Sequence, residues 1–129
     1  MPMISSVFVY GTLMPGQPRW AAVDEASAGA PVRDSIRGRL FDTGSGYPAL
    51  VTADRHSTVK GWRVLIEKSA LVATLAYIDE IEGTDVGLYR RIAVDTDSGV
   101  PCWTYEYLQP TAEMPDLGGR WPADDQNQS

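Results

Sequence analysis

The chain has 129 residues, an apolar fraction of 43%, four Trp and six Tyr, which is typical of one folded domain with its own hydrophobic core. Its 17 acidic residues against 11 basic ones give a formal net charge of −6, which repels phosphate backbones and argues against nucleic-acid binding. One cysteine excludes an internal disulfide, and one histidine without a Cys-x-x-Cys pair leaves no evident metal-ligand set. With no visible signal peptide and no apolar run of membrane-spanning length, we expect a cytoplasmic protein without a membrane partner.

The first predicted element is a short buried strand over Ile4–Val9, because four of these six residues are apolar. It is followed by a loop with two glycines and a proline, Tyr10–Gly16, and then by a predicted helix over Pro18–Ala26 that begins with proline. The helical side chains expected to face the core are Trp20, Val23 and Ala26.

The middle of the chain predicts further strands. Val32–Phe41 is strand-like although arginines interrupt its alternation, and the turn-rich residues 42–48 separate it from the apolar residues 49–51. Val59–Ile66 alternates, and we expect the face that carries Trp62, Val64 and Ile66 to be the buried one.

A hairpin is predicted near the end of the chain, with strands over Tyr89–Asp95 and Val100–Leu108 around a turn at residues 97–99. Trp103, Tyr105 and Tyr107 alternate in the second strand and therefore share one face. Of Arg90 and Arg91, one should face solvent, and we expect the other to pair with Asp79 or Glu80.

The segment Ser69–Gly83 is predicted to be a helix, with Ser69 able to cap its start and Gly83 placed to end it. Leu71, Leu75 and Ile78 are spaced four and three apart and so lie on one face. The next position on this apolar stripe is Glu82.

An acid at this position is unusual, because Glu82 is carried toward the core at the last turn of the helix. Desolvation and the partial negative charge of a helix C-terminus both oppose its ionisation. A carboxyl with a raised pKa is a candidate general base. A solvated acid at a frayed helix end is the alternative, and the pattern alone leaves it open.

About six strands clustered in sequence and two helices predict an α+β fold. Many short strands tend to close on themselves, so we expect a mixed, mostly antiparallel closed β-barrel flanked by two or more helices. Residues 1–110 would form this domain, and the polar residues 111–129 are expected to be a partly mobile tail.

The loop after the first strand is a second candidate site. A glycine that directly follows a buried strand allows close approach to the main chain, and the amides of Gly11, Thr12 and Leu13 could form an anion-binding concavity. The pattern Gly-x-x-x-x-Gly-Lys-Ser/Thr is missing, so a small carboxylate fits better than a nucleotide phosphate. A plain strand-to-helix turn is the alternative interpretation.

The first strand and loop, Val7-Phe-Val-Tyr-Gly-Thr-Leu13, resemble the Tyr-Gly-Ser/Thr-Leu signature of the γ-glutamylcyclotransferase-like (AIG2-like) family. Further segments resemble the family in the same order, and together the similarity spans roughly residues 6 to 108. These segments are Gly38–Asp42, Gly46–Leu50, Val59–Val64, Ile78–Gly83 with Tyr89–Arg91, and Cys102–Tyr107.

The resemblance implies a mixed β-barrel flanked by helices, with one cavity between the first loop and the acidic end of the helix. Glu82 stands at the position of the family's catalytic acid/base, and Tyr89 would hydrogen-bond Glu82 or the substrate. The residues that the resemblance assigns to substrate binding are Tyr10, Gly11, Thr12, Leu13 and Tyr89.

The implied reaction converts a small γ-glutamyl-amine or γ-glutamyl-amino acid to 5-oxoproline and releases the amine, without a cofactor or metal. The expected protein is a monomer or homodimer whose partner is this small molecule. A non-catalytic module that binds a small carboxylate in the same cavity is the main alternative. A Cys102 nucleophile is a weaker one, because Cys102 lies in the middle of a predicted strand with no histidine nearby in sequence.

Overall fold

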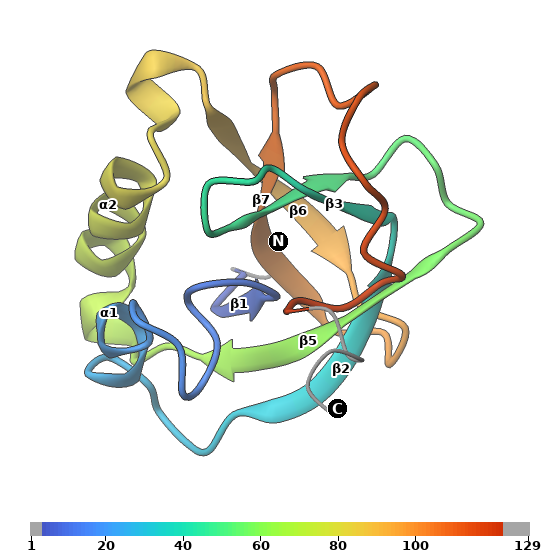
Figure 1. The fold of residues 1–129 in the computed structure, drawn as a ribbon. Helices are drawn as coiled ribbons and strands as arrows, with labels where there is room; N and C mark the ends of the chain where they lie inside the picture. Colours follow the sequence, from blue (N-terminus) through green and yellow to red (C-terminus); the bar gives the residue numbers. More distant parts are fainter. Residues whose placement is uncertain (1–3, 123–129) are drawn as a thin grey trace.

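Strand β1 (Ser6–Val9) lies at the centre of the five-stranded sheet, and all four of its residues are buried. The computed structural model, which describes residues 4–122, pairs β1 with an antiparallel strand on one side and a parallel strand on the other (Figure 1). Because side chains alternate along a strand, Val7 and Val9 enter one hydrophobic cluster and Phe8 enters another.

The described strands form two sheets. The five-stranded sheet has the order β2 (Val32–Arg37), β5 (Thr58–Leu65), β1, β7 (Pro101–Tyr107), β6 (Tyr89–Asp95). A separate antiparallel pair consists of β3 (Arg39–Asp42) and β4 (Pro48–Val51). The α+β class and the mixed sheet are therefore confirmed. The expected closure of the strands into one barrel is not, because the hydrogen bonds divide them between these two sheets.

The two hydrophobic clusters cover opposite faces of β1. The first lies between the sheet and the helices, α1 (Ala21–Asp24) and α2 (Leu71–Ile81), which lie side by side in Figure 1. The second contains Phe8 together with residues of β2, β3, β4 and β5, and thus joins the large sheet to the small one.

Strand β5 contributes to both clusters, which corrects the expectation that only one of its faces is buried. Val64 is buried against the helices as predicted, but Val59 is buried in the second cluster and Lys60 on the expected face is exposed. Gly61 allows this packing, because a Cβ there would lie 2.8 Å from Cζ of Phe8 and 2.2 Å from the carbonyl oxygen of Val9.

The predicted strand Val32–Phe41 is two strands. The chain leaves the large sheet at Gly38, whose φ of +155° favours glycine, and the Gly38 N–H donates to the carbonyl of Ser57 at 3.0 Å. The local pattern did not reveal this break, since the residues on either side of it are equally strand-like.

Both predicted helices are present with different limits. The first is regular only over Ala21–Asp24, although Val23 is buried and Trp20 packs beside it as expected. The second begins at Leu71 after a short 3-10 turn, η1 (Lys68–Ala70), and Ser69 makes no capping hydrogen bond, so the predicted cap is wrong. Its other end is as predicted, because Gly83 has a φ of +70° and is followed by η2 (Thr84–Val86).

The predicted hairpin is confirmed, with β6 and β7 paired from Tyr89 opposite Tyr107 to Asp95 opposite Pro101. Arg91 pairs with Asp79 of α2 at 3.2 Å, and its guanidinium lies 4.7 Å from the ring centre of Trp103. The more exposed Arg90 pairs with Glu106 at 3.0 Å.

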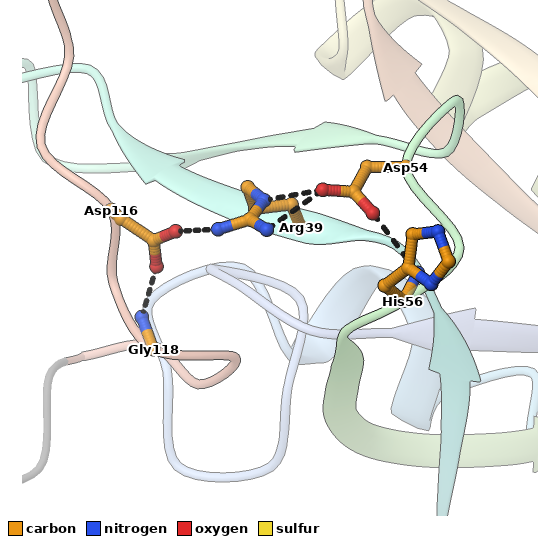
Figure 2. Close-up of polar contacts among 5 residues, drawn as sticks. All are labelled: Arg39, Asp54, His56, Asp116 and Gly118. Carbon is orange, nitrogen blue, oxygen red and sulfur yellow. Dashed lines mark hydrogen bonds and ion pairs between the residues drawn. The ribbon is translucent and has the colours of Figure 1, made fainter.

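The chain beyond β7 returns to the small sheet. The N–H of Leu117 donates to the carbonyl of Leu40, and Arg39 forms ion pairs with both Asp54 and Asp116 (Figure 2). The Asp116 carboxylate in turn accepts the N–H of Gly118. Of the expected tail, residues 111–122 thus contain segments that contact the domain, while residues 123–129 lie outside the described residues.

Candidate active site

Three residues of the loop after β1, Gly11, Thr12 and Leu13, line a cavity. Gly11 backs directly onto Pro48, because a Cβ at Gly11 would lie 2.8 Å and 2.9 Å from two ring carbons of that proline. The carbonyls of Gly11 and Thr12 accept hydrogen bonds from the N–H groups of Met14 and Arg19, which fix the loop. The N–H groups of Gly11, Thr12 and Leu13 donate none within residues 4–122, so they are available to an anion.

Glu82 follows the last residue of α2 and is held there by its own N–H, which donates to the carbonyl of Ile78 at 2.9 Å. The residue is partly buried, and its carboxylate forms no hydrogen bond or ion pair with the described part of the chain. Burial raises the pKa of Glu82 to about 7, and the positive charge of Arg19 partly opposes this rise. The carboxyl can therefore both accept and release a proton near neutral pH.

Two tyrosines support the walls of the site. The Tyr10 hydroxyl donates to the carbonyl of Tyr105 at 2.7 Å, and the Tyr89 hydroxyl donates to the carbonyl of Pro48. Burial raises the pKa of both phenols, which keeps them neutral. The expected hydrogen bond from Tyr89 to Glu82 is not made, because Pro48 already accepts this proton and thereby joins β6 to β4.

A single cavity of about 380 Å³ brings the expected site residues together. The loop after β1, the end of α2 and the start of β6 all reach it, although they are far apart in sequence. Its walls include Tyr10, Gly11, Thr12, Leu13, Glu82 and Tyr89. Free amides and a weakly acidic carboxyl in one cavity can bind an anionic group and transfer a proton beside it.

Several residues of this cavity were not predicted from the sequence. Pro48, the first residue of β4, and Tyr47 just before it also line the cavity, and the ring centres of Tyr47 and Tyr89 are 6.2 Å apart. They belong to the segment Gly46–Leu50, whose resemblance to the family was the available signal. Arg19 also lines the cavity, and no sequence signal separated it from the other surface arginines.

The alternative nucleophile lies elsewhere. Cys102 is buried in β7 outside this cavity, and burial raises the pKa of its thiol to about 11, which disfavours the reactive thiolate.

His56 is exposed, and its backbone N–H donates to Asp54 (Figure 2). Residues 4–122 contain no cluster of three or more His, Cys, Asp or Glu side chains suited to a metal ion. Nor does any helix among them have the length and apolar character needed to cross a membrane.

Similar proteins point to one family. Residues 7–123 match the family described as "Gamma-glutamyl cyclotransferase, AIG2-like". A relative from Niallia circulans, named gamma-L-glutamyl-butirosin B gamma-glutamyl cyclotransferase, is 34% identical in an alignment over 110 residues, and the alignment covers 79% of this chain and 66% of the relative. The aligned part of the chain thus spans slightly less than two thirds of that protein.

Solved structures share the fold. An AIG2-like protein from Mus musculus superposes with a TM-score of 0.70 at 21% identity, covering 89% of this chain and 86% of its own. An uncharacterized protein from Pyrococcus horikoshii superposes with a TM-score of 0.62 at 25% identity, covering 84% and 80% of the two chains. The match to the family extends over most of the chain, and it includes both the loop after β1 and the end of α2. The chain therefore belongs to the gamma-glutamyl cyclotransferase, AIG2-like family.

Proposed function

We propose that this protein is a γ-glutamylcyclotransferase that converts a small γ-glutamyl-amine or γ-glutamyl-amino acid to 5-oxoproline and releases the amine. The observation that carries the proposal is the unpaired carboxyl of Glu82. It has a pKa of about 7 and lies in the same cavity as three free amides. Family membership supports the reaction class, and the name of the Niallia circulans relative supports a γ-glutamyl compound as substrate.

Substrate binding begins at the loop. The α-carboxylate of the glutamyl group would accept hydrogen bonds from the amides of Gly11, Thr12 and Leu13, with Tyr10 and Tyr89 forming the adjoining walls. In this pose the neighbouring α-ammonium group would lie near Glu82. Because the nucleophile and the carbonyl belong to one molecule, holding the folded-back conformer supplies much of the rate.

Glu82 then transfers the protons. The α-ammonium cannot attack until it loses a proton, which the Glu82 carboxylate accepts. The free amine forms a bond to the γ-carbonyl carbon, and the bond from that carbon to the departing nitrogen breaks as Glu82 returns the proton to this nitrogen. Over the whole reaction, the α-nitrogen, which becomes the ring nitrogen, loses two protons and the departing nitrogen gains two. Glu82 transfers these protons one at a time and is ionised at the end, as it was at the start. This proton transfer requires no metal or cofactor.

The experiment compares wild type, Glu82→Gln and Glu80→Gln on a panel of γ-glutamyl-amines and γ-glutamyl dipeptides, measuring 5-oxoproline release. Glu80 is an exposed acid on the same helix, so Glu80→Gln makes the same charge change away from the cavity. We expect release by wild type and Glu80→Gln and none by Glu82→Gln with the fold retained. Unchanged turnover by Glu82→Gln would exclude this mechanism.

The alternative is a non-catalytic module that binds a small carboxylate in the same cavity, since the free amides alone could do so. Calorimetric binding of glutamate-like ligands by wild type, with no 5-oxoproline from any substrate of the panel, would favour it.

The proposal also places the protein in the cytoplasm as a monomer or homodimer, which fractionation and light scattering would test.

A further inference from the structure

Arg19 connects the two halves of the cavity. Its backbone N–H donates to the carbonyl of Thr12 at 2.9 Å, which ties it to the loop that carries the free amides. Its guanidinium Nη1 donates to the carbonyl of Ile81 at 3.3 Å, at the last residue of α2. A cation at this helix end is favourable, because the terminal carbonyls carry partial negative charge.

The guanidinium lies close to Glu82 without pairing with it. Its charge acts on the carboxyl of Glu82, yet no ion pair joins the two side chains in the described part of the molecule. Arg19 is exposed and lines the cavity, where, among the described lining residues, it alone is cationic. Since a guanidinium has five N–H donors and Ile81 accepts from one nitrogen, most of them remain available.

The proposed reaction determines which part of the substrate would lie beside these donors. Glu82 must reach the departing nitrogen in order to protonate it, so the substituents on that nitrogen lie beside the end of α2. If the departing amine is an amino acid, its carboxylate is separated from the nitrogen by a single carbon. A carboxylate is the group whose planar pair of oxygens matches the guanidinium fork.

We propose that Arg19 is a specificity-determining residue that binds the carboxylate of the departing amino acid, so that γ-glutamyl-amino acids are preferred over neutral γ-glutamyl-amines. This inference rests on the proposed cyclotransferase reaction. The glutamyl α-carboxylate has its own donors in the loop amides, which leaves Arg19 for the other end of the substrate. In a chain of net charge −6, a cation at the cavity also offsets the repulsion of an anionic leaving group.

The test uses two substrates that differ only in this group, γ-glutamylalanine and γ-glutamylalaninamide. Their kcat/KM values are compared in wild type, Arg19→Gln, Arg19→Lys and Arg55→Gln, at a pH well above 7 so that Glu82 is ionised throughout. Arg55→Gln removes the same charge from an exposed residue outside the cavity. The acid/amide ratio of kcat/KM isolates the contribution of the carboxylate.

We expect wild type and Arg55→Gln to prefer the acid, and Arg19→Gln to lower the acid/amide ratio by roughly tenfold, the size of a partly exposed charge-assisted hydrogen bond. Arg19→Lys should keep part of the preference, because it retains the charge but not the planar fork. Salt should weaken the preference of wild type more than that of Arg19→Gln.

Equal losses on both substrates in Arg19→Gln would overturn the inference, and would instead indicate that Arg19 binds the glutamyl group or supports the fold. If wild type releases 5-oxoproline from neither substrate, that result contradicts the proposed function but does not test the role of Arg19. The preference for the acid is then measured as the ratio of calorimetric Kd values for the same two ligands, with wild type and Arg19→Gln. A Kd ratio unchanged by the substitution would likewise overturn the assignment of Arg19.

Discussion

The hydroxyl of Tyr105 donates a hydrogen bond to Oδ1 of Asp79 at 2.6 Å, which joins β7 to the last turn of α2. The same carboxylate oxygen pairs with Nε of Arg91 in β6 at 3.2 Å. Asp79 lies three positions before Glu82, so the sheet holds the helix end that carries the proposed acid/base. The backbone carbonyl of Tyr105 also accepts the Tyr10 hydroxyl beside the cavity, which links both walls to one residue.

Tyr105→Phe should therefore loosen the site while leaving Asp79 paired with Arg91. We expect a loss of about 1.5–3 kcal/mol in the free energy of unfolding, the usual effect of removing a hydrogen bond to a charged group. A lower kcat should accompany it, since Glu82 is held less well. Urea denaturation and steady-state kinetics measure the two effects. Tyr107→Phe is the matched control, because no hydrogen bond of the Tyr107 hydroxyl is found within residues 4–122. Equal behaviour of the two variants would contradict this role.

Glu82→Gln should stabilise the protein at alkaline pH. The pKa of Glu82 is about 7 in the folded protein against an ordinary 4.5, so the folded state binds the proton more tightly than the unfolded chain. Stability is thus lost as pH rises from about 4.5 through 7, by at most about 3 kcal/mol. The glutamine variant escapes this loss, and its advantage should be absent near pH 4.5 and complete above 7. Chemical denaturation across this range measures the difference, and an advantage independent of pH would contradict the burial argument.

The same pKa predicts the pH dependence of the reaction. Only ionised Glu82 can accept the α-ammonium proton, so kcat/KM should fall as pH drops below about 7. Arg19→Gln removes the charge that lowers the pKa of Glu82, and the midpoint should therefore move to higher pH. Arg55→Gln should leave the midpoint in place, as its guanidinium lies outside the cavity. A midpoint near the ordinary 4.5 of glutamate would show that another group limits the rate.

Gly11→Ala should disturb the cavity by a steric clash and not by backbone strain, since φ at Gly11 is not positive. The added methyl would meet the ring of Pro48 at 2.8 Å, and the carbonyl of Pro48 accepts the hydrogen bond of Tyr89. We expect a cost of roughly 1–3 kcal/mol in stability and an increased KM, because the loop amides must shift. Gly29→Ala is the control, for a Cβ there meets nothing within 4 Å. A wild-type KM for Gly11→Ala would contradict the close packing of the loop.

Local patterns were sufficient wherever a side chain had only to avoid water. The run Ile4–Val9 identified the central strand, and the stripe of Leu71, Leu75 and Ile78 identified the buried face of α2. Glu82 continues that stripe, so its position at the cavity followed from the spacing and from the family resemblance. The left-handed conformation of Gly83 was predictable as well, because the end of a helix is set mainly by the residues of its last turn.

Contacts between distant segments were not predictable in this way. The hydroxyl of Tyr89 reaches Pro48 rather than Glu82, and Arg19 reaches Ile81, 62 residues away. Likewise, Val59 is buried because the small sheet folds over its face of β5. Residue types and their spacing are enough to identify the apolar residues, the turns that require glycine and the acid on an apolar face. The partner of each buried polar group is known only from the folded molecule, because it depends on how distant strands and helices are brought together.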